Sequence, residues 1–189
     1  MCRTFFYVNQ INNCGRNMQY FLKNIAKKLV FGSILIYNYK VIRVKEEIYM
    51  VTLDKIYHAS YVLKDVVIPT PLVKATAISD DCEVYLKPEN LQITGSFKVR
   101  GSGYKISQLT EEEKKRGVIA CSAGNHAQGV ALAATKYGIK SLICLPDGAP
   151  ISKVEATKGY GAEVCMVPGV YDDAYNKACE LRDEHNYTF

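Results

Sequence analysis

The chain has 189 residues, of which 48% are apolar and 23% charged, the proportions of an ordinary soluble globular protein of one domain or slightly more. The net charge of +5 comes entirely from residues 1–49, which hold eight Lys or Arg against two acidic residues; residues 50–189 hold sixteen against seventeen. The near-neutral balance of residues 50–189 argues against nucleic-acid binding. The seven cysteines include no CxxC pair, so they support neither a disulfide framework nor a zinc site.

The first 49 residues form a leader rich in Asn, Tyr, Lys and Ile. Its apolar run Leu29–Tyr37 is shorter than the roughly 20 residues that span a bilayer, and no small-residue cleavage pattern follows it. Three interpretations of these residues remain open: a weak membrane or targeting segment, an extra strand or helix, or upstream sequence that is not native protein. We favour the last, because a natural N-terminal helix, capped by Thr52, follows Met50.

From residue 51 onward, helices alternate with short apolar strands. Helices are predicted over 51–67, from Ser96, after the Thr110–Glu113 capping box, and over 125–138, 151–161 and 170–186. Strands are predicted over 83–89, 117–123, 140–146 and 162–168, with another just beginning at 187–189. This alternation indicates an α/β fold, an open parallel sheet with helices on both faces. Three cysteines lie in apolar runs and are expected to be small buried side chains: Cys121, Cys144 and Cys165.

A lysine directly after Ser-Phe, between Gly95 and Gly101, is the first candidate for chemistry. With Ser96 as N-cap, Lys98 falls in the first turn of a helix, where the positive end of the helix dipole and the charge of Arg100 favour a neutral amine. Such an amine can condense with an aldehyde. On these residues alone, however, a solvated lysine or one paired with a carboxylate is the more common case.

The second candidate is the loop "CSAGNHAQG", Cys121–Gly129, between a buried strand and a helix. Gly124 allows a ligand to approach the backbone, and the amides from Ala123 to His126 can cradle a carboxylate or phosphate. Ligands of open α/β sheets bind beyond the carboxyl ends of the strands, which is where this loop is predicted. An ordinary turn capped by Asn125 is the alternative.

The sequence resembles the serine/threonine dehydratase family of fold type II pyridoxal-phosphate enzymes, and it fits the threonine dehydratases (threonine ammonia-lyases) best. The resemblance is carried by "TPL" at 70–72 and by the segments 86–101, 109–134 and 161–164. The resemblance implies that Lys98 holds pyridoxal 5'-phosphate, that Phe97 packs near its ring and that Asn125 hydrogen-bonds the ring hydroxyl. It also implies a set of substrate-binding residues, which are Ser96, Ser122, Ala123, Gly124, Asn125 and His126.

The implied reaction is β-elimination of L-threonine to 2-oxobutanoate and ammonia, or of L-serine to pyruvate and ammonia. The resemblance further implies a small amino-acid substrate, a cytoplasmic homo-oligomer without membrane or nucleic-acid partners, and no metal. Two alternatives remain: serine racemase or another fold type II enzyme, and a non-catalytic α/β module that binds anions.

The resemblance also implies two domains around the cofactor, with residues 50–92 in the larger domain and 93–189 in a smaller, C-terminally truncated one. The family's glycine-rich phosphate loop and its late Ser, Thr or Cys for the pyridine nitrogen do not appear in this sequence, and Ser102 replaces the usual alanine. We therefore expect this chain to have little activity alone.

Overall fold

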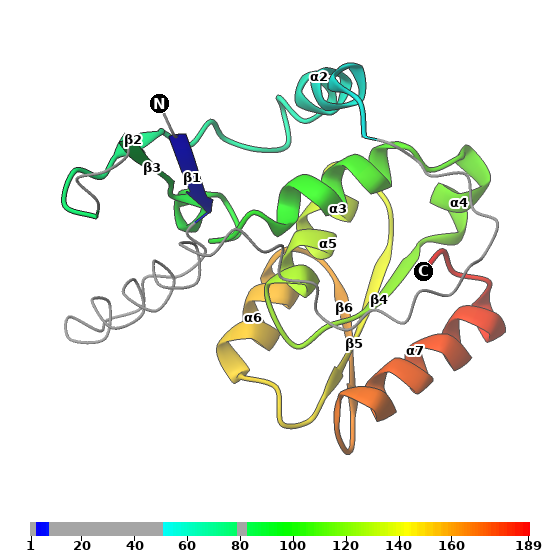
Figure 1. Ribbon diagram of the computed structural model, residues 1–189. Helices are drawn as coiled ribbons and strands as arrows, with labels where there is room; N and C mark the ends of the chain where they lie inside the picture. The colour runs from blue at the N-terminus through cyan, green and yellow to red at the C-terminus, as the bar shows by residue number, and fades with distance from the viewer. Residues whose placement is uncertain (1–2, 8–50, 79–82) are drawn as a thin grey trace, which may run out of the picture.

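The computed structural model describes residues 3–7, 51–78 and 83–189. The strands in these ranges form two three-stranded sheets (Figure 1). In the first sheet the order is β1-β3-β2, with β1 parallel and β2 antiparallel to β3. Its strands are β1 (Arg3–Tyr7), β2 (Val73–Lys74) and β3 (Glu83–Lys87). Thus part of the leader pairs with β3, whereas the apolar run Leu29–Tyr37 lies outside the described residues.

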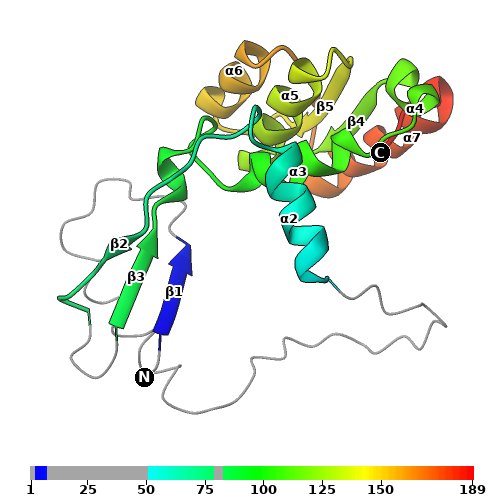
Figure 2. The ribbon, with the colours of Figure 1, turned by 90° about the horizontal axis from the view of Figure 1, so that it is seen from above.

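The second sheet positions the candidate site. It contains three parallel strands in the order β4-β5-β6, where β4 is Val118–Cys121, β5 is Ser141–Pro146 and β6 is Glu163–Val167. Two helices, α5 (Asn125–Lys136) and α6 (Ile151–Gly159), cover one face, and α7 (Tyr171–His185) covers the other (Figures 1 and 2). The predicted parallel sheet with helices on both faces is confirmed.

The remaining helices precede β4 in the chain. The helix α3 (Lys98–Ser107) packs on α5, and α2 (Leu53–Val62) packs on α3 (Figure 2). A single 3₁₀ turn, η1 (Glu89–Leu91), follows β3, and α4 (Glu111–Arg116) precedes β4. None of the α2 residues is buried, and Leu63 and Val66, just after the helix, enter the core.

Local sequence explains where the helices begin and end. The Thr52 hydroxyl accepts a hydrogen bond from the Lys55 amide at 3.4 Å, and Thr110 and Glu113 form the predicted capping box. The helix α5 ends before Gly138, whose φ of 67° is open to glycine at little cost. These three predicted helix boundaries are confirmed.

Apolar burial on both faces holds the second sheet. All four β4 residues are buried, and the larger cluster joins β4 and β5 to α5, with Ile143, Leu145 and Ala131 at its centre. Under α7, three cysteines lie in register on neighbouring strands: Cys121, Cys144 and Cys165. Burial and the adjacent Cys165 thiol raise the pKa of Cys144 to about 12. Cys121 and Cys144 are buried as predicted, and Cys165 is half-buried.

The last residues extend the sheet at its β4 edge. Thr188 forms a parallel bridge with Val118, with its amide donating to Gly117 at 3.0 Å and its carbonyl accepting from Ile119 at 2.9 Å. The strand predicted to begin at 187–189 is therefore present as a single bridge. Within the described ranges, no helix has both the length and the apolar character needed to cross a bilayer.

Candidate functional site

Lys98 lies in the first turn of α3, as the sequence predicts, but it is the first residue of the helix and Ser96 is not the N-cap. Phe97 occupies that position without a side-chain capping bond, so α3 begins one residue later than a Ser96 cap would give. Ser96 is fully buried, and its hydroxyl accepts from the Lys98 amide at 3.4 Å. Ser96 thus supports the start of α3 from one position upstream of the cap.

The Lys98 side chain is exposed, and its Nζ lies 4.8 Å from the centroid of the Phe97 ring. Arg100, two residues after Lys98 in α3, faces a carboxylate. The Arg100 guanidinium forms two hydrogen bonds with Glu89, Nε to Oε2 at 2.8 Å and Nη2 to Oε1 at 2.9 Å, so a carboxylate balances its charge.

Glu89 anchors α3 to the first sheet, a function that sequence reasoning missed. Its side chain is fully buried, and Oε1 also accepts from the Thr70 hydroxyl at 2.6 Å. Burial would raise the pKa of Glu89, but hydrogen bonds from Arg100 and Thr70 and the charges of Arg100 and Lys87 lower it overall. The network joins the "TPL" segment to the helix that begins with Lys98.

A close contact between α3 and α5 sets the position of Lys98. A Cβ added at Gly129 of α5 would lie 3.0 Å from the Lys98 carbonyl carbon and 3.0 Å from Ser102 Oγ. The Ser102 hydroxyl itself donates to the Lys98 carbonyl at 3.0 Å. Only glycine permits this approach of the two helices, and the sequence prediction had not assigned Gly129 any part in it.

This packing brings Lys98 close to the asparagine loop. Desolvation first, and then the positive charge of Lys98, lower the pKa of His126 on α5, although part of the His126 side chain reaches solvent. Lys98 and the loop are therefore neighbours, as the sequence predicts. The Lys98 side chain nevertheless stays exposed among the described residues.

The loop itself has an accessible backbone. Gly124 is the N-cap of α5, a Cβ there would meet nothing within 4 Å, and its amide donates to Ser122 Oγ at 3.3 Å. Asn125 begins the helix, and Ala123 packs partly into the core. Asn125 Oδ1 accepts from Lys153 Nζ at 2.8 Å, a partner that the sequence reasoning missed. The start of α5 can accordingly receive an anion at its backbone amides.

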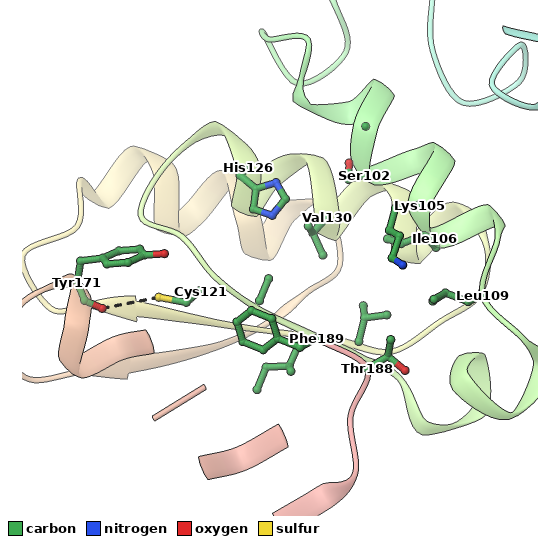
Figure 3. Close-up of a pocket in the computed structure, with 14 residues that line it drawn as sticks. Ser102, Lys105, Ile106, Leu109, Cys121, His126, Val130, Tyr171, Thr188 and Phe189 are labelled. Atoms are coloured by element: carbon green, nitrogen blue, oxygen red, sulfur yellow. Dashed lines mark hydrogen bonds between the residues drawn. The ribbon is translucent and has the colours of Figure 1, made fainter. Parts of the chain in front are cut away.

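A separate cavity of about 380 Å³ lies beside this loop, along β4 and under α3 (Figure 3). His126 and Lys105 line one side and Thr188 and Phe189 the other, with Tyr171 at the end (Figure 3). Its lining includes neither Lys98 nor Asn125. The cavity therefore shares only His126 with the predicted cofactor and substrate residues.

Comparisons with known proteins agree with this geometry. Residues 63–189 match the family model described as pyridoxal-phosphate dependent enzyme. The chain is 48% identical over 142 residues to an L-threonine ammonia-lyase of Thermotoga maritima, an alignment that covers 74% of this chain and 35% of that protein. The chain thus spans about a third of the length of that relative.

Solved structures give the same fold. A maize serine racemase superposes with a TM-score of 0.67 at 33% identity, covering 71% of this chain and 42% of the other. A threonine deaminase isoform of Solanum lycopersicum superposes with a TM-score of 0.64 at 34% identity, covering 72% and 42%. The cofactor that the sequence resemblance implied is the cofactor of the matching family. The chain therefore belongs to the family of pyridoxal-phosphate dependent enzymes.

Proposed function

We propose that the whole protein catalyses β-elimination of L-threonine, and of L-serine, to a 2-oxo acid and ammonia. The observation that carries this proposal is the position of Lys98, whose amine lies at the start of α3 next to the anion-accepting start of α5. The likeness to an L-threonine ammonia-lyase supports the choice of substrate.

The residues near Lys98 fit the reactive end of pyridoxal phosphate. Lys98 offers a primary amine for the aldehyde, Phe97 an aromatic face within 4.8 Å of that amine, and Asn125 an amide for a ring oxygen. The sequence contains no glycine-rich run that could bind the cofactor phosphate. The residues named here therefore fit the aldehyde and the ring of the cofactor, and not its phosphate. When bound, the cofactor supplies an electron sink for negative charge at the substrate Cα.

The protein residues would then bind the substrate and move a proton. Backbone amides at the start of α5, from Ala123 to His126, would hold the substrate carboxylate, since they carry the positive end of the helix dipole. Lys98 Nζ, in its neutral form, would take the Cα proton and return it to the β-hydroxyl, which would leave as water. Hydrolysis of the released enamine by one water would then give the 2-oxo acid and ammonia. Desolvation lowers the pKa of His126 and so favours its neutral form, which adds no charge beside Lys98.

Covalent trapping at Lys98 tests the cofactor part of this proposal. After incubation with pyridoxal phosphate and reduction with borohydride, peptide mapping should place a pyridoxyl group on Lys98, and Lys98→Ala should lose it. Lys105→Ala, an exposed lysine of the same helix, is the matched control and should keep it. Labelling spread over many lysines would contradict the proposal. A non-catalytic anion-binding module would keep anion binding in Lys98→Ala.

A product assay decides the reaction. Whole protein should convert threonine to 2-oxobutanoate and ammonia, whereas this chain alone should show little turnover. The second candidate is serine racemisation, favoured by the superposition on maize serine racemase, and accumulation of D-serine without keto acid would select it. The cytoplasmic location and the homo-oligomer implied by the resemblance stay predictions.

A further inference from the structure

Lys153 makes a contact with the candidate site that the proposed reaction does not use. Its Nζ donates to Asn125 Oδ1 at 2.8 Å. Lys153 lies in the first turn of α6, in the βα unit next to the one that carries the asparagine loop. Because β4 and β5 are parallel neighbours, the loops after them lie at the same edge of the sheet. The neighbouring unit thus contributes a side chain to this loop.

The Lys153 backbone is held firmly. Its amide donates to the Pro150 carbonyl at 2.8 Å, and its carbonyl accepts from the Thr157 hydroxyl at 2.7 Å. Thr157 is fully buried, and the Lys153 side chain is half-buried between α6 and the loop. The backbone from which the Lys153 side chain reaches Asn125 is therefore fixed.

The chemistry of the two groups fixes the orientation of the Asn125 amide. An ammonium has only donors, so it can bind the oxygen of the amide and never its nitrogen. With Oδ1 held by Lys153, the Nδ2 group points to the opposite side, and no partner for Nδ2 is found within the described part of the chain. Asn125 therefore presents two donors and no acceptor to a ligand.

We propose that Lys153 is a positioning residue that orients Asn125 as a hydrogen-bond donor toward the cofactor ring oxygen. This inference rests on the proposed function, in which Asn125 meets that oxygen. An oxygen that carries negative charge needs a donor, and a rotated amide would present its own oxygen and repel it. Lys153 also adds a positive charge beside the start of α5, which favours the same anionic form of the ring oxygen.

Three measurements on the 189-residue chain test this, with Lys153→Met as the variant. Without cofactor, the ¹⁵N–¹H peaks of the Asn125 side-chain amide should shift in Lys153→Met. With pyridoxal phosphate, affinity for uptake at Lys98 should fall roughly tenfold, the effect of losing one charged hydrogen bond. The visible absorbance of the bound cofactor should also shift, because the protonation of its ring oxygen changes.

Three controls separate positioning from general damage to the fold. Lys153→Arg keeps the donors and should restore the absorbance. Lys158→Met removes an exposed α6 lysine paired with Glu155 and should change nothing. In Asn125→Ala, adding Lys153→Met should weaken cofactor uptake no further, because the two residues act through one contact.

Unchanged Asn125 amide peaks in Lys153→Met would overturn the inference, whether or not the chain binds cofactor. Additive losses in the double variant would overturn it as well. By contrast, absence of pyridoxyl on Lys98 in the unmodified chain would refute the proposed function and leave the Asn125 peaks to decide the contact with Lys153.

Discussion

Replacing Gly129 with alanine should push α3 and α5 apart. The new Cβ would lie 3.0 Å from the Lys98 carbonyl carbon, 3.1 Å from its oxygen and 3.0 Å from Ser102 Oγ. Two of these atoms belong to backbone, so the contact cannot be relieved by turning a side chain. The helices must separate by several tenths of an ångström.

The size of the effect follows from two opposing terms. Alanine in a helix interior is better than glycine by about 1 kcal/mol, whereas overpacking costs about 1–3 kcal/mol. Subtracting the gain from the cost leaves a fall of up to about 2 kcal/mol in the free energy of unfolding of Gly129→Ala. Gly101 of α3 is the matched control, because a Cβ there would meet nothing within 4 Å, so Gly101→Ala should gain up to about 1 kcal/mol.

Urea unfolding of both variants measures the free energy of unfolding, and thermal unfolding checks it. A difference of about 2 kcal/mol between them corresponds to roughly 4–8 °C in Tm for a domain of this size. If Gly129→Ala were as stable as Gly101→Ala, the α3–α5 contact would not limit the packing, and the argument for how Lys98 is placed would fail.

Two further predictions use the charges around α3. Glu89→Gln should destabilise the fold by about 3 kcal/mol, because it breaks a buried pair and leaves Arg100 without its carboxylate. The pKa of Glu89 is lowered in the folded state, so its stabilisation should be complete above about pH 4.5 and be lost as pH falls below that value. Urea unfolding at a series of pH values should show this loss in the unmodified chain and a flatter profile in Glu89→Gln. Removing the Lys98 charge in Lys98→Met should raise the pKa of His126 only part of the way to its usual value, since desolvation, the larger cause, remains. An NMR titration of the His126 ring protons measures this, and an unchanged pKa would place Lys98 too far away to act on the loop.

Much of the fold could be predicted from the sequence, because its causes are local. Apolar runs such as 117–123 and 140–146 predict buried strands, and capping residues such as Thr110 predict where helices start. The alternation of strands and helices then predicts a parallel sheet, and it places the loop of Asn125 at the carboxyl end of a strand. What covers α2 could not be predicted, because periodicity shows an apolar stripe and not its partner.

The contacts of the candidate site were decided by tertiary structure alone. Residues distant in the chain meet Lys98 and Asn125, and no local pattern shows which they are. Gly129 determines how closely two helices approach, Glu89 balances the charge of Arg100, and Lys153 reaches Asn125 across 28 positions of sequence. Helix packing and the order of strands in the sheet set these distances, so the residue types were visible in the sequence and their partners were not.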